Sequence, residues 1–133
     1  MIDCENEVFT MVAQSLRTAF PGIDVASEYI PEPASFPHVS IYMADSYNDL
    51  RDQTGSLQES MSTMMFQVDV YSNKTHGKKT ECKEINKHIC DLLFAHNFVR
   101  SSSTPTPNMS NATIYRITSR FRVVSDGEHF YRR

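Results

Sequence analysis

The 133-residue sequence has no tryptophan, few glycines and no long apolar run. Its four glycines, Gly22, Gly55, Gly77 and Gly127, are isolated from one another, so no glycine-rich loop is available to cradle a phosphate group. Every apolar stretch falls short of the roughly 20 residues that a membrane-spanning helix requires. These features argue against nucleotide binding and against membrane insertion.

Cysteine is also scarce, with Cys4, Cys82 and Cys90 forming an odd set. The N-terminus is acidic where a secretory signal is positively charged, so we expect free thiols in a reducing cytoplasm. Cys82 and Cys90 lie on one predicted helix about 12 Å apart along its axis, which prevents a disulfide between them. No CxxC, HxxxH or HExxH pattern occurs, and we expect neither a metal site nor a cofactor.

The overall composition is that of a globular chain. Hydrophobic residues make up 40% and charged residues 22% of the sequence, and the net charge is -3. The length suits one domain, residues 1–133, with a single core. The charge is too small to indicate a nucleic-acid-binding protein, so we expect no direct nucleic-acid recognition.

Two amphipathic helices are predicted. Apolar residues recur at helical spacing from Asp3 to Phe20, and Pro21-Gly22 ends this first helix. Capping residues at 72–75 precede a second helix, which ends near Phe98. The stripe expected to face the core of the second helix comprises Cys82, Ile85, Ile89, Leu92, Leu93 and His96.

Alternation of apolar and polar residues predicts the strands. The segments with this period are 23–30, 38–44, 64–71 and 115–123, with a short edge strand inside 101–111 and a hairpin strand at 129–131 after the turn 125–128. Residues 31–37 hold three prolines and should form an exposed connection, and residues 45–59 should form a long mobile loop. This order of elements predicts an α+β fold, a two-layer sandwich of a mostly antiparallel sheet with two helices packed on one face.

Charged residues gather in three places. The polar region 45–59 is acidic, the start of the second helix is basic, and one face of the last long strand is rich in arginine. A solvated surface is the simplest explanation of each group. The alternatives are a contact with another subunit or partner and, for the arginine face, the binding of phosphates. The candidate interface residues are Asp45, Asp49, Asp52, Glu59, Lys78, Lys79, Arg116, Arg120, Arg122 and Arg132.

The layout resembles the small tail terminator, or tail completion, proteins of tailed bacteriophages over nearly the full length. The segments that carry the resemblance are Phe20-Pro21-Gly22, residues 66–73, residues 92–98, residues 115–122 and the hairpin to Tyr131-Arg132-Arg133. The resemblance implies a hexameric ring that caps the tail tube, stops its polymerisation and presents a surface for joining the head.

The same resemblance implies the partners. These are further copies of the chain, the tail tube protein and the head–tail connector, in a virion tail assembled in the host cytoplasm, with DNA passing through the ring. A head completion or neck connector protein of the same virion is the alternative. A small cytoplasmic enzyme is a more remote one, because no GxSxG turn or other nucleophile device is present and we expect no catalysis.

Overall fold

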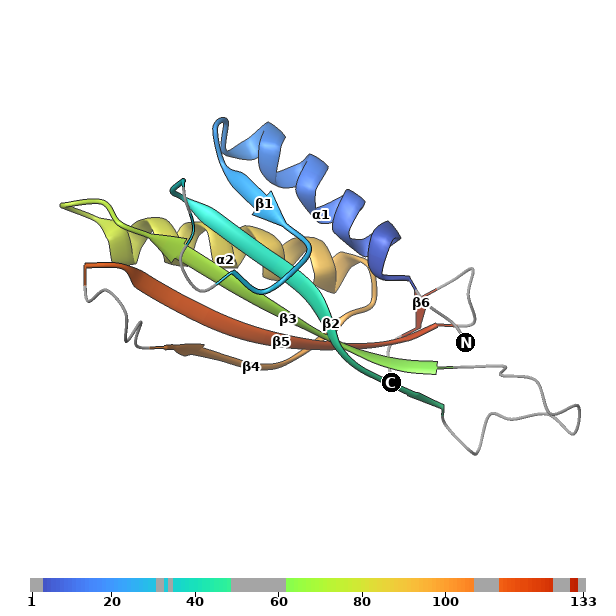
Figure 1. The fold of residues 1–133 in the computed structure, drawn as a ribbon. Helices are drawn as coiled ribbons and strands as arrows, with labels where there is room; N and C mark the ends of the chain where they lie inside the picture. The colour runs from blue at the N-terminus through green and yellow to red at the C-terminus, as the bar shows by residue number, and fades with distance from the viewer. Residues whose placement is uncertain are drawn as a thin grey trace, which may run out of the picture.

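The structure has two layers, a sheet and a pair of helices that cover one of its faces (Figure 1). This computed structural model describes residues 4–30, 33, 35–48, 62–106, 113–125 and 130–131. The elements are α1 (Glu5–Ala19), β1 (Asp24–Ala26), β2 (His38–Asn48), β3 (Ser62–Ser72), α2 (Lys78–Ala95), β4 (Val99–Pro105), β5 (Tyr115–Ser125) and β6 (Phe130–Tyr131).

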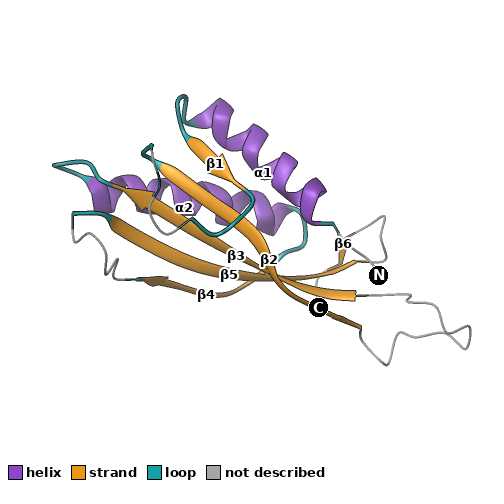
Figure 2. Cartoon of the chain, viewed as in Figure 1, coloured by secondary structure: helices purple, strands orange, loops and turns teal. Residues whose placement is uncertain are grey.

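The sheet has the strand order β1-β2-β3-β5-β4, and β6 also pairs with β5. All pairings are antiparallel except that of β1 with β2, which is parallel. Helix α1 packs against β2 and α2, and α2 packs against β3, β5 and β4, as the purple and orange layers of Figure 2 show. The predicted α+β sandwich with both helices on one face is therefore confirmed.

The core lies between the two layers, where each element contributes its predicted apolar stripe. Fully or almost fully buried side chains include Val8, Val12 and Leu16 of α1, Ile85, Ile89 and Leu93 of α2, Val39 and Ile41 of β2, Phe66, Val68 and Val70 of β3, and Phe121 and Val123 of β5. Burial of this apolar surface is the main force that stabilises the fold. Among the described residues, no helix combines the length and apolarity needed to cross a bilayer.

A small polar cluster is buried beneath α2. Asn86 donates to the Ser103 hydroxyl at 3.0 Å and accepts from Ser119 at 2.8 Å, and the two serine hydroxyls lie 2.7 Å apart. Every member thus has a partner, which keeps the cost of burying these groups small. The cluster joins α2 to β4 and β5.

Strand β2 is longer than predicted. It runs to Asn48, so the first four residues of the expected loop 45–59 belong to a strand, and the remainder of that loop lies outside the described residues. The pairing with β3 shifts register between Met43 and Asp45. A bulge of this kind inverts the alternation of side chains, which is why the sequence pattern stopped at residue 44.

Two other boundaries differ from prediction. The strand expected at 23–30 is only three residues long, because the chain beyond Ala26 leaves the sheet edge. Helix α2 begins after Gly77, whose φ of 82° suits glycine, and not after the capping residues 72–75. The Ser72 hydroxyl instead donates to Glu81 in the first turn of α2 at 2.7 Å.

The buried stripe of α2 also needs correction at its ends. Leu92 is only partly buried and His96 is exposed, whereas Asn86 is buried within the polar cluster. Strand β4 occupies seven residues at the sheet edge, longer than the short strand expected. Phe130 and Tyr131 pair antiparallel with the end of β5, as predicted, and the turn residues 126–129 lie outside the described residues.

Truncating the core residue Ile89 to alanine should lower the free energy of unfolding by about 3 kcal/mol, because lost burial and a cavity act together. The exposed neighbour Lys87 provides the control, and Lys87→Ala should change it by less than about 0.5 kcal/mol. Urea unfolding measures both variants. Equal effects would mean that α2 does not bury the stripe described above.

Candidate subunit interface

The sheet face that the helices leave uncovered contains a buried carboxylate, Asp69 of β3, which is 0% exposed. Its Oδ1 accepts hydrogen bonds from Arg116 Nε at 3.2 Å, Arg116 Nη2 at 2.9 Å and the Thr118 hydroxyl at 2.7 Å. Pairing of β3 with β5 sets Asp69 opposite Thr118, beside Arg116. A buried charge is tolerated only when it is paired and hydrogen-bonded in this way.

The guanidinium group of Arg116 contacts two aromatic rings. Its central carbon lies 5.4 Å from the ring centroid of Tyr29 and 5.5 Å from that of Tyr71. Such cation–π contacts add to the ion pair with Asp69. Tyr29 follows β1 in the chain, so Arg116 holds this side chain against the sheet.

Two tyrosines complete the group, which we call the Asp69 cluster: Asp69, Arg116, Tyr29, Tyr42 and Tyr71. The Tyr42 hydroxyl donates to Asp69 Oδ2 at 3.3 Å, and its ring meets that of Tyr29 edge-on at 6.4 Å. Burial, together with the negative charge of Asp69, raises the pKa of Tyr42 from 10.0 to about 12. Tyr71 is fully buried, and its hydroxyl has no hydrogen-bond partner among the described residues.

A second polar group, around His38, lies on the same face nearer the β1 edge of the sheet. The imidazole of His38 is buried. Its Nδ1 lies 2.9 Å from Asp24 Oδ2, and its Nε2 lies 2.9 Å from the Ser40 hydroxyl oxygen. Its ring packs against Tyr71 at 5.7 Å. Residues of β1, β2, β3 and β5 are thereby linked in one row across the uncovered face.

The arginines predicted to line an interface differ in their surroundings. Arg116 is paired within the chain, so its charge needs no partner from another subunit. Arg120 is exposed on the same face, opposite Gln67, and Arg122 is partly buried. Arg132 lies outside the described residues.

The lysines and acidic residues are more dispersed. Lys78 donates to the backbone oxygen of Thr113 at 3.2 Å, and Lys79 is exposed. Asp45 is exposed just beyond the bulge and accepts from the Ser46 amide. The other acidic candidates, Asp49, Asp52 and Glu59, lie outside the described ranges.

Sequence reasoning missed the Asp69 cluster. The alternation of β3 correctly placed Asp69 and Tyr71 on the face away from the core, but such a position predicts a solvated side chain. Only the register of β3 against β5 sets Asp69 beside Arg116. The signal available in the sequence was an acidic residue in one long strand and an arginine-bearing face in another.

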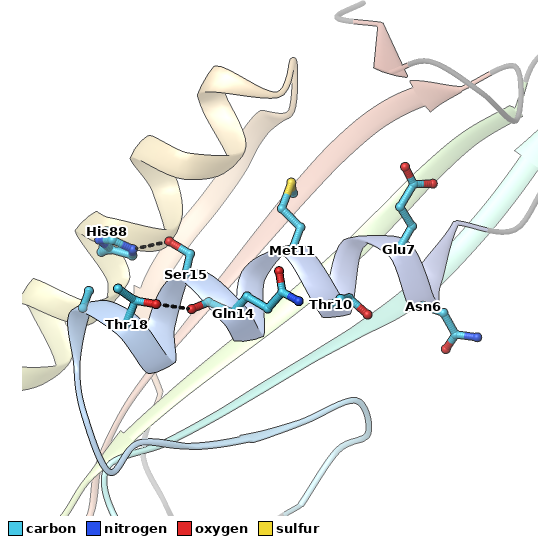
Figure 3. Close-up of a pocket in the computed structure, with 9 residues that line it drawn as sticks. Asn6, Glu7, Thr10, Met11, Gln14, Ser15, Thr18 and His88 are labelled. Carbon is cyan, nitrogen blue, oxygen red and sulfur yellow. Dashed lines mark hydrogen bonds between the residues drawn. The ribbon is translucent and has the colours of Figure 1, made fainter.

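The outer side of α1 carries a shallow, widely open groove, bordered on one side by His88 of α2 (Figure 3). Glu7, Met11 and Ser15 lie along the helix at its mouth. The Ser15 hydroxyl is 2.8 Å from His88 Nε2, an arrangement that also occurs in nucleophile–base pairs. Within the described residues no carboxylate bonds the other ring nitrogen of His88, and we interpret the pair as a contact between the two helices.

The three cysteine thiols are buried or partly buried within the subunit. Cys82 donates weakly to backbone oxygens of Val70 and Tyr115, and burial raises its pKa to about 12. Cys4 is buried and Cys90 partly exposed, and none of the three forms a disulfide. In the ranges that the structure describes, no three histidine, cysteine or acidic side chains gather as metal ligands would.

Removal of the buried carboxylate should destabilise the fold strongly. Asp69→Ala leaves the largely buried Arg116 unpaired, and we expect a loss of about 3 kcal/mol in the free energy of unfolding. Lys74→Ala removes the exposed partner of the partly buried Glu81, which still accepts from Ser72, and should cost less than about 1 kcal/mol. Urea unfolding distinguishes the two, and similar small losses would show that the Asp69 pair contributes little.

Stability should fall in alkaline solution. Because folding raises the pKa of Tyr42 to about 12, the folded chain binds more protons than the unfolded chain above about pH 10, and its free energy of unfolding decreases through that window. Tyr42→Phe removes this contribution, so the variant should lose less stability between about pH 9 and about pH 11. Burial also raises the pKa of Tyr71 and Cys82, so part of the loss remains. Identical losses in both proteins would contradict the assignment.

Comparison with known proteins provides fold relatives. No protein-family model and no curated protein matches the sequence. A chain from the virion of a native gene transfer agent particle superposes with a TM-score of 0.58 at 18% identity, over 85% of this chain and 90% of that one. A chain from the PVC sheath/tube terminator of an extracellular contractile injection system, in the extended state, has a TM-score of 0.52 at 10% identity. This match covers 96% of the present chain but only 58% of the other. The fold is thus shared with components of both particles, in agreement with the resemblance to tail terminators.

Proposed function

We propose that this chain is a tail terminator of a phage-like particle. Copies form a ring that caps the tail tube, ends its polymerisation and presents the surface to which the head is joined. The observation that supports this most strongly is the fold shared with a sheath/tube terminator chain over 96% of the present sequence. The role is structural and needs no catalysis.

The two-layer architecture suits a ring. One side of the sandwich is a sheet face with exposed Arg120 and half-exposed Tyr29, and the other is a helical surface with the groove along α1. A molecule with two unlike surfaces can pack head-to-tail, and a suitable rotation between copies closes the ring. Six copies, as the resemblance implies, require each surface to meet its complement once per subunit.

The two rims of such a ring have different partners. One rim binds the end of the tail tube, and the other binds the head–tail connector, with DNA passing through the centre. The candidates for these contacts are the acidic residues that follow Asn48, namely Asp49, Asp52 and Glu59, and two lysines at the start of α2, Lys78 and Lys79. The particle is then the site of action, after assembly in the host cytoplasm.

Deletion of the gene that encodes this chain, followed by inspection of the particles made without it, tests this role. A terminator is required to stop the tube, so its loss should give tails of uncontrolled length that carry no heads. Tails of normal length that fail to join heads would contradict the terminator role and indicate a neck connector. Electron microscopy of negatively stained lysates measures both tail length and head attachment.

Charge reversal at Arg120 should weaken the ring without unfolding the subunit. Arg120→Glu alters an exposed side chain on the uncovered sheet face, so the free energy of unfolding should change by less than about 0.5 kcal/mol. Like-charge contacts across an interface should raise the dissociation constant of the ring by about tenfold or more. Lys87→Glu, on the exposed side of α2, is the control. Sedimentation velocity measures assembly, and a normal ring from Arg120→Glu would exclude a role for this side chain.

A further inference from the structure

We propose that the two surfaces meeting in the ring are the uncovered sheet face of one copy and the α1 groove of the next. In this contact Tyr29 enters the groove beside Met11 and Ser15, and Arg120 pairs with Glu7. The inference rests on the proposed function and names the contact through which the ring closes. The occupant of the groove is thus a second copy of this chain.

Tyr29 has the character of an interface anchor. It is 48% exposed although it is a large aromatic residue, and its ring is held in place from below by Tyr42 and Arg116. A side chain fixed before binding loses little conformational entropy on association. Exposed tyrosines next to arginine are typical of the residues that dominate binding energy at interfaces.

The groove offers a complementary surface. Met11 lines it between Glu7 and Ser15, is partly buried, and provides an adaptable apolar contact for an aromatic ring. Polar atoms of Gln14, Ser15 and His88 surround one end, where a tyrosine hydroxyl can bond. Figure 3 shows that Glu7, Met11 and Ser15 project from the same side of α1, so an occupant can contact all three.

The charges on the two surfaces match in sign. Arg120 is exposed on the sheet face, and Glu7 is exposed at the N-terminal end of the groove. A second pair has the reverse order, with exposed Glu28 next to Tyr29 and exposed Arg17 in the last turn of α1. Complementary charges of this kind fix the register of an interface and disfavour alternative pairings.

The spacing also agrees. Tyr42, Gln67 and Arg120 are register partners on three adjacent strands, so the backbone of Arg120 lies about 10 Å from that of Tyr42, against which Tyr29 packs. Glu7 and Gln14 are separated along α1 by a rise of about 10 Å. An aromatic ring at the Gln14 end of the groove therefore brings Arg120 to Glu7.

The two surfaces lie on opposite sides of the sandwich. No residue of a copy can reach its own complement, so the contact is heterologous and propagates from copy to copy. A ring or a filament follows, and a closed two-fold dimer does not. Because the two surfaces lie far apart within one subunit, a disulfide between them can form only between two copies.

Disulfide trapping tests the contact directly. Glu7→Cys and Arg120→Cys are combined in a Cys90→Ser background, which removes the one partly exposed native thiol. A disulfide requires Cα atoms within about 7 Å, which the two positions cannot satisfy inside one subunit. We expect oxidation to give a ladder of covalent multimers on non-reducing gels, whereas each single-cysteine variant alone gives none.

A matched control replaces Glu7→Cys by Glu84→Cys, an exposed position on α2 outside the groove, and should give no ladder. Sedimentation velocity on the same samples reports whether rings form. Rings without the Glu7–Arg120 ladder, or equal ladders in the control, would overturn the inference and leave the proposed function standing. If no rings form even when tail tubes are present, the ring itself is wrong.

Charge exchange provides an independent readout. Glu7→Arg and Arg120→Glu should each raise the dissociation constant of the ring by about tenfold, and the double variant should recover most of that loss. Glu84→Arg is the control for the first change. Additive losses in the double variant would show that the two residues do not meet.

Discussion

The buried ion pair of Asp69 and Arg116 determines how the uncovered face of this sheet is built. A carboxylate with no exposed surface is unstable unless several donors surround it, and β5 supplies those donors from two neighbouring residues. Once Arg116 is fixed by Asp69, Tyr29 can pack on the guanidinium group. The Tyr29 side chain is thereby held on the uncovered face. The need to pair one buried carboxylate thus determines how the side chains around it are arranged on this face.

Shape is also what the proposed role demands. The described residues form a sandwich whose two sides differ in chemistry, one aromatic and cationic, the other helical and grooved. Ordinary interface physics then suffices for assembly: preformed anchors, an open apolar groove and matching charges. The Ser15–His88 pair and the three thiols are accounted for by contacts within the subunit.

The helices and the long strands could be predicted from the sequence because their apolar periods are uninterrupted. Val8, Val12 and Leu16 repeat at helical spacing, and the alternation from Met64 to Val70 has no break. The second half of β2 could not be predicted, since the bulge after Met43 inverts the pattern. The strand predicted at 23–30 was longer than β1 because Tyr29 continues the apparent alternation of Ile23 and Val25. The ring of Tyr29 in fact lies on the opposite side of the sheet from the core.

The candidate surfaces were harder to predict than the fold. Exposed charge identified Arg120 and its neighbours, but the same criterion selected Arg116, whose partner Asp69 is adjacent only after β3 and β5 pair. The groove along α1 involves Met11 and His88 from two helices, and no local pattern places these residues together. Long-range register and helix packing supply this information, and neither is readable from spacing along the chain.

Assembly by shape is the central claim, and the native mass of the purified chain measures it most directly. Closure of a head-to-tail ring predicts one dominant species of defined copy number, six if the likeness to tail terminators extends to stoichiometry. An open-ended series of masses, or a chain that stays monomeric even in the presence of tail tubes, would contradict it.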